Sequence, residues 1–148
     1  TSEVFKTLVR RNVVAQEALL SNACPPVEDA VHFATIDLAN KVCARYLVSF
    51  TNSGASVLGL AKFRPLMPLI AFSQKPATLR KLALVWGVEP LQLGAVQSVD
   101  DLLSSATEFL LNKGMVREGE TVVFTAGVPV GVSGGTNMIK VVKVEKAD

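Results

Sequence analysis

Apolar and polar residues alternate along this chain in blocks that predict strands and helices in turn. Short apolar runs rich in β-branched and aromatic residues predict five strands, at residues 46–50, 67–72, 88–93, 121–125 and 138–144. Apolar residues three and four positions apart predict helices, and these positions fall within residues 2–20, 28–42, 57–61, 79–86 and 99–110. Alternating strands and helices with short connections predict an α/β fold.

The last two predicted strands are joined differently from the others, because no helical pattern separates them. A direct loop returns the chain antiparallel, whereas a parallel neighbour needs a long crossover. The prediction is therefore an α/β, three-layer α/β/α sandwich with a five-stranded mixed sheet, its last strand antiparallel. An N-terminal helix at 2–20 precedes it, and the small, polar and proline residues at 21–26 mark a boundary.

Small and polar residues follow the first predicted strand, before a helix that Pro65 ends. Thr51, Asn52 and Ser53 can accept hydrogen bonds from free amides at the helix start, and Gly54 lets the backbone turn. Backbone amides at such a turn can hold an anion. Simple helix capping is the alternative interpretation.

A glycine-rich loop joins the last two strands, at the same predicted edge of the sheet. Ligands of such sheets gather beyond the carboxyl ends of the parallel strands, and glycines permit the close backbone approach that a phosphate or another subunit needs. The residues predicted to contribute are Gly131, Val132, Ser133, Gly134 and Gly135.

Composition narrows the function classes. Hydrophobic residues make up 49% of the 148 residues, which fits a sheet buried on both faces plus a subunit or domain interface. A net charge of +2 without a basic stripe argues against a nucleic-acid partner. No apolar run approaches the ~20 residues that span a bilayer, and no leader is recognisable, so we expect no membrane association and a cytoplasmic location.

Four residues with reactive or large side chains have simple interpretations. Cys24 and Cys43 have no metal-type spacing, so we expect reduced, buried and inert thiols and no metal site. His32 lies off the apolar series of its helix, formed by Val31, Ala34, Leu38 and Val42, and is predicted to be a surface or boundary residue rather than a general base. Trp86 continues the apolar series of its own helix and is predicted to pack in the core rather than to stack on a ligand.

Four segments in order resemble the C-terminal domain of pyruvate kinase. They are Thr51-Asn52-Ser53-Gly54, Lys62-Phe63-Arg64-Pro65 with Pro68-Leu69-Ile70-Ala71, Leu82-Ala83-Leu84-Val85-Trp86-Gly87-Val88, and Thr125-Ala126-Gly127-Val128-Pro129-Val130-Gly131 with Gly135-Thr136-Asn137. Residues 1–22 resemble the last helix of the family's catalytic barrel with its linker, and 23–148 resemble the C-terminal domain.

The resemblance implies a fragment without catalytic residues. The family enzyme transfers a phosphoryl group from phosphoenolpyruvate to ADP with magnesium and usually potassium. None of the residues that hold those ligands maps to this chain, so we expect no cofactor here and no activity of the chain alone. The implied partners are its own catalytic barrel and further copies in a tetramer.

The resemblance also implies an allosteric site. Many members bind a phosphorylated effector at the loop that corresponds to 51–56, with hydroxyls that match Thr51, Ser53 and Ser56. Ala55 and Asn52 stand where basic residues are common, and the tryptophan and arginine of sugar-bisphosphate-responsive members are missing before Glu118. Charge-assisted bonds to phosphate are about twice as strong as neutral ones, so the missing basic residues should weaken binding of a sugar bisphosphate. A sugar monophosphate, a nucleotide or no effector at all are therefore alternatives of equal weight.

Two other functions stay open: a stand-alone α/β module that binds a small phosphorylated metabolite, and a purely structural oligomerisation domain. A (β/α)₈ barrel encoded upstream would favour the regulatory interpretation. The first residue is Thr1 rather than methionine, which also favours an excised piece.

Overall fold

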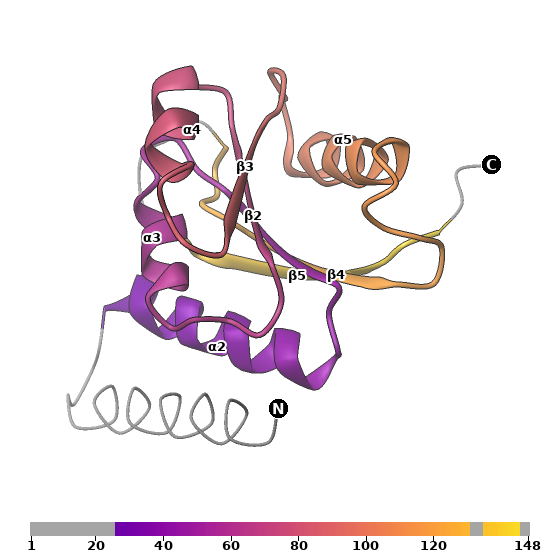
Figure 1. Ribbon diagram of the computed structural model, residues 1–148, viewed down its shortest axis with the longest axis horizontal. Helices are drawn as coiled ribbons and strands as arrows, with labels where there is room; N and C mark the ends of the chain where they lie inside the picture. Colours follow the sequence, from indigo (N-terminus) through magenta and orange to yellow (C-terminus); the bar gives the residue numbers. More distant parts are fainter. Residues whose placement is uncertain (1–25, 131–134, 146–148) are drawn as a thin grey trace.

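The computed structural model describes residues 26–130 and 135–145, which form one mixed sheet between two layers of helices (Figure 1). The predicted helix at 2–20, the boundary at 21–25 and Cys24 lie outside the described residues. The elements are α2 (Val27–Lys41), β1 (Tyr46–Phe50), α3 (Ala55–Ala61), β2 (Leu69–Ser73), α4 (Pro76–Leu82), β3 (Val88–Gln92), α5 (Val99–Asn112), β4 (Thr121–Ala126) and β5 (Met138–Lys143).

The five strands run in the order β3-β2-β1-β4-β5, so the first strand lies at the centre of the sheet. Strands β1 to β4 are parallel to one another, and β5 pairs antiparallel with β4. Ser49 of β1 lies between Ala71 of β2 and Thr125 of β4. The predicted α/β fold, with a mixed sheet and an antiparallel last strand, is confirmed.

Local sequence signals explain where several helices begin and end. The Ser98 hydroxyl accepts a hydrogen bond from the Asp101 amide at 3.1 Å, which caps the start of α5. Pro76 is the first residue of α4, where its missing N–H costs nothing. Gly114 follows α5 with φ +68°, a conformation that glycine adopts without strain.

One side of the sheet, the α5 face, is packed entirely with apolar side chains. Strand residues such as Val48, Ile70 and Phe124 meet Leu102, Ala106 and Leu110 of α5. The Phe50 ring stacks between those of Phe72 and Phe124, with centroid separations of 5.7 and 5.9 Å. This aromatic row runs across the carboxyl ends of the three central strands.

The other side, the three-helix face, is covered by α2, α3 and α4 (Figure 1). Its core joins strand and helix side chains, among them Leu47, Leu69, Val123, Val57, Leu60 and Leu82. The buried polar residues of the described chain also lie on this side, as members of its helices, of its inward strand positions or of the loop before β5: His32, Thr35, Ser49, Ser73, Thr78, Thr125 and Thr136.

Helix α2 turns a different face inward from the one its spacing predicts. It buries His32, Thr35, Ile36 and Ala39, whereas the predicted series at 31, 34, 38 and 42 is partly or fully exposed. Apolar residues lie on almost every side of this helix, so spacing alone does not select one face. Packing against α3 makes the selection.

His32 is therefore buried, at 2% exposure, and the prediction of a surface residue is wrong. Gly59 of α3 provides the space that the imidazole ring fills. A Cβ atom at Gly59 would lie 2.5 Å from Cε1 of His32 and 2.6 Å from Nδ1. The ring and the glycine form one fitted contact between the two helices.

Two further predictions about single residues are wrong. Trp86 is 70% exposed, because α4 ends at Leu82 and the chain turns before the tryptophan. The guanidinium of Arg64 lies 4.6 Å from the centre of its ring, an arrangement that suits an exposed aromatic side chain. Cys43 is exposed and has φ 52° in the turn between α2 and β1.

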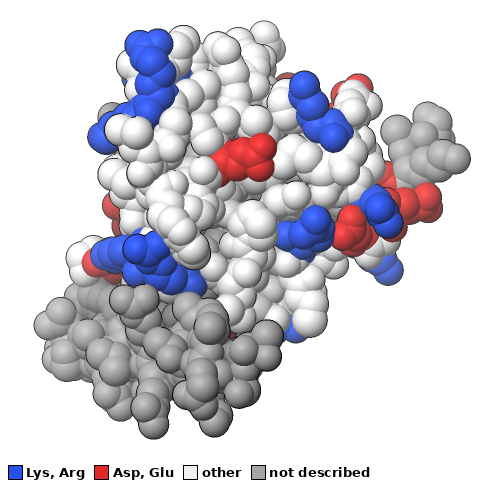
Figure 2. Space-filling view, viewed as in Figure 1, with Lys and Arg blue, Asp and Glu red and all other residues white. Residues whose placement is uncertain are grey.

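Charge on the face seen in Figure 2 is distributed in small groups of both signs over a mostly uncharged surface. Within the described residues, no helix is long and apolar enough to cross a bilayer.

Candidate functional site

A cavity of about 440 Å³ opens at the carboxyl edge of the parallel strands. The central strand β1 has β2 on one side and β4 on the other, so the connections after β1 and β4 leave the sheet at a topological switch point. The segments that follow all four parallel strands contribute lining residues, which fall within 51–56, 73–75, 93–96 and 126–130, and Gly135 joins them.

The turn between β1 and α3 is organised by its own hydroxyls. The Thr51 hydroxyl accepts a hydrogen bond from the Gly54 amide at 2.8 Å, and the Ser53 hydroxyl accepts one from the Ala55 amide at 3.3 Å. Gly54 has φ +91°, a conformation that favours glycine. These contacts are those of the capping interpretation. A hydroxyl that accepts a bond nevertheless keeps its own proton for donation.

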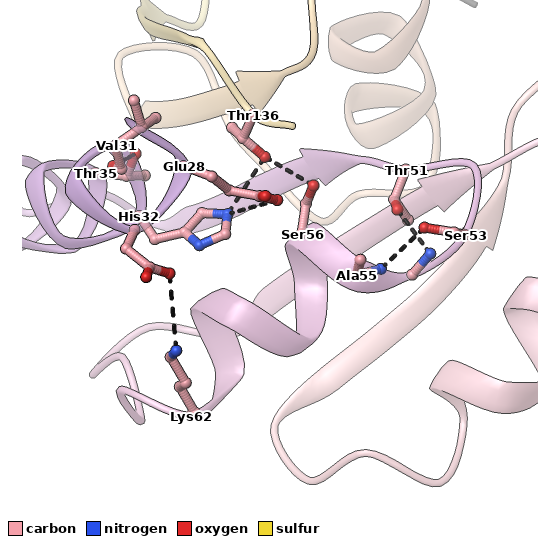
Figure 3. A network of polar contacts seen from close by, with 12 residues as sticks. Glu28, Val31, His32, Thr35, Thr51, Ser53, Ala55, Ser56, Lys62 and Thr136 are labelled. Atoms are coloured by element: carbon pink, nitrogen blue, oxygen red, sulfur yellow. Dashed lines mark hydrogen bonds and ion pairs between the residues drawn. The ribbon is translucent and has the colours of Figure 1, made fainter. Parts of the chain in front are cut away.

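The third hydroxyl of this turn, on Ser56, is held from a distant part of the chain (Figure 3). The Thr136 hydroxyl donates to Ser56 Oγ at 2.7 Å, and Thr136 Oγ1 also lies 3.3 Å from His32 Nε2. Residues from α2, α3 and the loop before β5 therefore meet in one hydrogen-bonded chain. Apart from the presence of a single histidine, no sequence pattern predicts these hydrogen bonds.

The turn between β2 and α4 contributes residues that the sequence analysis missed. The Ser73 hydroxyl accepts a hydrogen bond from the Lys75 amide at 3.2 Å, and Ser73, Gln74 and Lys75 all line the cavity. Thr78 donates to the Asn52 carbonyl at 2.7 Å and ties this turn to the previous one. A repeated strand-turn-helix unit was the available signal, because parallel neighbours end at the same edge.

Lys75 brings a positive charge to a site whose first turn has none. Lys75 lies in the turn between β2 and α4, so a search for a basic residue within 51–56 alone does not find it. Glu28 of α2 lines the cavity as well, and its side chain is 38% exposed. Among the described residues, the cavity wall thus has one cationic and one anionic side chain.

The remainder of the wall is apolar. It consists of side chains from the aromatic row, from the connection after β3, and from α5 and the β4 loop: Phe50, Phe72, Leu93, Val96, Leu102 and Val130. The site therefore combines a hydroxyl-rich side with an apolar side, which suits a ligand that has a polar group and a carbon skeleton.

His32 lies beneath the cavity in a mixed electrostatic setting. Burial lowers the pKa of its imidazole below the ordinary value of 6.5, and the carboxylates of Glu28 and Asp29 partly offset this effect. Lys62, which lies 3.9 Å from Asp29, adds to the lowering of the pKa. The structure thus favours the neutral imidazole.

The predicted residues Thr51, Asn52, Ser53 and Ser56 line this cavity, and Gly54 shapes the turn that carries them. From the second predicted loop, Gly135 also lines the cavity, and a Cβ atom there would lie 2.9 Å from Oε2 of Glu28. The prediction for Gly131, Val132, Ser133 and Gly134 lies outside the described residues. Within 26–130 and 135–145, no three His, Cys, Asp or Glu side chains gather where a metal ion could bind.

Comparisons with known proteins agree on one family. The family model described as "Pyruvate kinase, alpha/beta domain" matches residues 29–142. A pyruvate kinase of Geobacillus stearothermophilus is 35% identical over 136 residues, which cover 92% of this chain and 23% of that protein. One of Clostridium acetobutylicum is 38% identical over 117 residues, 79% of this chain and 25% of that protein.

Solved structures agree on the fold. A crystal structure of Cryptosporidium parvum pyruvate kinase matches 90% of this chain and 26% of that chain, with a TM-score of 0.72 and 21% identity. The chain spans about a quarter of the length of the curated relatives it matches.

Proposed function

Because this chain belongs to the pyruvate kinase family as its C-terminal α/β domain, we propose that it is the regulatory and subunit-interface domain of a pyruvate kinase. The full enzyme would transfer the phosphoryl group of phosphoenolpyruvate to ADP, and its catalytic barrel would be the partner of this domain. The cavity at the carboxyl edge of the sheet would bind a phosphorylated small molecule as an allosteric effector.

One observation carries the effector site: four hydroxyls on the cavity wall accept hydrogen bonds, and none donates to a described residue. They belong to Thr51, Ser53, Ser56 and Ser73. By contrast, the hydroxyls of Thr35, Thr78 and Thr107 donate to backbone carbonyls. Four hydroxyl protons without an acceptor among the described residues suit a ligand group that only accepts, such as a phosphate oxygen.

The expected affinity is moderate. Each hydrogen bond to a charged oxygen contributes roughly 1.5–3 kcal/mol, so three of them near the upper end of that range are needed to approach the roughly −8 kcal/mol of micromolar binding, and Lys75 would add to them. α3 has seven residues, so its dipole adds little. The apolar wall would hold the carbon skeleton of a sugar monophosphate or a nucleotide.

The test is a titration of the chain with inorganic phosphate, a sugar monophosphate and a nucleoside monophosphate, followed by amide chemical shifts. We expect shifts in residues 51–56 and 73–75, with Ser53→Ala and Ser56→Ala each weakening binding about tenfold. Binding that both substitutions leave unchanged would place the site elsewhere. No binding at millimolar concentrations would leave only the capping role.

The subunit-interface part is supported by a difference between the two edge strands. β3 carries Pro90, which cannot donate a ladder hydrogen bond, whereas β5 has no proline and Val141 is 40% exposed. The β5 edge is thus the better surface for a second copy. Sedimentation at several concentrations tests this, and a strictly monomeric chain at high micromolar concentration would count against it.

A further inference from the structure

The hydrogen-bonded chain that links His32, Thr136 and Ser56 runs from the packed interior to the cavity (Figure 3). We propose that His32 is a positioning residue for this site. Its Nε2–H sets the direction of the hydrogen bonds that run from His32 through Thr136 to Ser56, so that Ser56 presents its proton to an anionic oxygen in the cavity. The part of this inference that concerns the anion rests on the proposed function. The direction of these hydrogen bonds does not depend on the proposed function.

The position of the ring is closely determined by packing. His32 is 2% exposed, and Gly59 leaves no room for even a methyl group beside the ring. Nε2 faces Thr136, while Nδ1 is buried without a hydrogen-bond partner among the described residues. The imidazole therefore has one polar contact that packing holds in place.

The direction of these hydrogen bonds follows from the buried Nδ1 atom. An Nδ1–H tautomer would bury an N–H donor without an acceptor among the described residues, which is rarer and more costly than a bare acceptor nitrogen without a donor. Nε2 then carries the hydrogen and donates to Thr136 Oγ1, which lies 3.3 Å away. The Thr136 proton is left for Ser56 Oγ, which lies 2.7 Å away.

The consequence reaches the cavity through Ser56. Its oxygen accepts from Thr136, its own proton is not used within the chain, and its side chain lines the cavity. A hydroxyl that accepts a hydrogen bond is also polarised into a stronger donor. Without the chain, the Ser56 hydroxyl could turn and offer a lone pair, which would repel an anion.

Charged groups on two elements face the ring: Glu28 and Asp29 from α2, and Lys62 from the end of α3. Glu28 Oε1 lies 3.9 Å from Nε2, beyond hydrogen-bond distance, so Thr136 is the nearer partner. A protonated ring would still donate from Nε2, but its Nδ1–H would be buried without an acceptor. The chain therefore needs the Nε2–H hydrogen and favours the neutral ring.

The first experiment reads the ring directly by nitrogen NMR of the chain near neutral pH. His32 is the single histidine, so its ring signals need no further assignment. We expect the neutral Nε2–H tautomer and protonation only below the ordinary pKa of 6.5. A neutral Nδ1–H tautomer, or a ring that titrates like an exposed imidazole, would overturn the proposal whether or not any ligand binds.

The second experiment titrates inorganic phosphate into matched variants. Thr136→Val keeps the shape and removes the link, so we expect phosphate affinity to fall about tenfold. His32→Gln keeps an N–H donor on a similar side chain and should retain most of the affinity. Thr35→Val is the control, because it removes an equally buried hydroxyl of α2 that bonds to the Val31 carbonyl within its own helix.

Unchanged phosphate affinity in Thr136→Val, or an equal loss in the Thr35→Val control, would overturn the positioning role. If the unmodified chain binds no phosphate, the proposed effector site fails and so does the donation of Ser56 to an anion. The tautomer measurement alone then decides whether His32 sets the direction of the hydrogen bonds through Thr136 to Ser56.

Discussion

The two faces of the sheet are built on different principles. The α5 face is packed with apolar side chains only, and its aromatic row stacks ring on ring. The three-helix face has an apolar core too, but it also contains the seven buried polar residues. Four of its side-chain atoms, on His32, Asn40, Ser49 and Thr125, are buried without a described partner. The α5 face is thus densely packed with apolar groups, whereas the three-helix face is less stable than it would be with apolar groups in place of these polar ones.

This contrast shows where function is located in such a fold. A buried polar group without a partner costs free energy that an apolar group of the same shape would not. On the three-helix face, Ser73 lines the proposed effector site, and Thr136 and His32 connect to it through Ser56, whereas the α5 face supplies the apolar wall of the same cavity. Substitutions that exchange the character of the two faces therefore test the comparison.

The largest effect is expected on the α5 face. Phe72 is 1% exposed and contacts the rings of both Phe50 and Phe109. Phe72→Ala should lower the free energy of unfolding by about 3–5 kcal/mol, because it leaves a large cavity in a dense core. Urea denaturation monitored by circular dichroism measures this. A loss under ~1 kcal/mol would mean that the aromatic row is not a main source of stability.

A smaller effect is expected from a substitution that adds volume to the three-helix face. Gly59→Ala places a methyl group against the His32 ring and should destabilise the chain by about 1–3 kcal/mol, despite the higher helix propensity of alanine. His32→Ala removes the obstacle, so the double variant should lose less than the two single variants together. Additive losses would show that the ring and Gly59 are not in tight contact.

Next comes a substitution expected to stabilise the chain. Thr125 is fully buried and its hydroxyl has no described partner, so Thr125→Val should raise the free energy of unfolding by about 1 kcal/mol. The matched change on the α5 face, Val48→Thr, should lower it by about 1–3 kcal/mol. If both changes destabilise equally, the buried hydroxyl of Thr125 has a partner, such as an ordered water molecule.

The smallest effect is the pH dependence that His32 contributes. Its pKa is lowered in the folded state, so as the pH falls below 6.5 the unfolded chain binds a proton first. Stability should therefore decline from that pH down to the folded pKa. We expect a small effect, because the carboxylates of Glu28 and Asp29 offset part of the lowering of the pKa by burial. Denaturation from pH 7.5 to 5 measures it, and His32→Gln should remove this part of the pH dependence.

Much of this architecture could be predicted from sequence because its signals are local. The apolar run at 46–50 predicted β1 correctly, and residues of the polar turn after it line the cavity. The short loop between the last strands was enough to predict an antiparallel β5. These features depend on chain connectivity and residue size, which a sequence displays directly.

What could not be predicted depends on contacts between distant elements. The buried side of α2 is selected by Gly59 of another helix, so the position of His32 was missed. Lys75 was missed because its contribution depends on which turns share an edge. Trp86 was misplaced because α4 ends one turn earlier than its apolar spacing indicates.

The central position of β1 also bears on how the chain folds during synthesis. β1 pairs with β2, which follows soon after it, but also with β4, which is made only after α3, β2, α4, β3 and α5. Until β4 leaves the ribosome, one edge of this central strand has no partner, and unpaired apolar edges invite aggregation. The pairing of β1 with β4 is expected to limit the folding rate, because it closes the long stretch of chain between these two strands and so reduces its conformational entropy. The nascent chain would therefore be most vulnerable between the synthesis of β2 and that of β4.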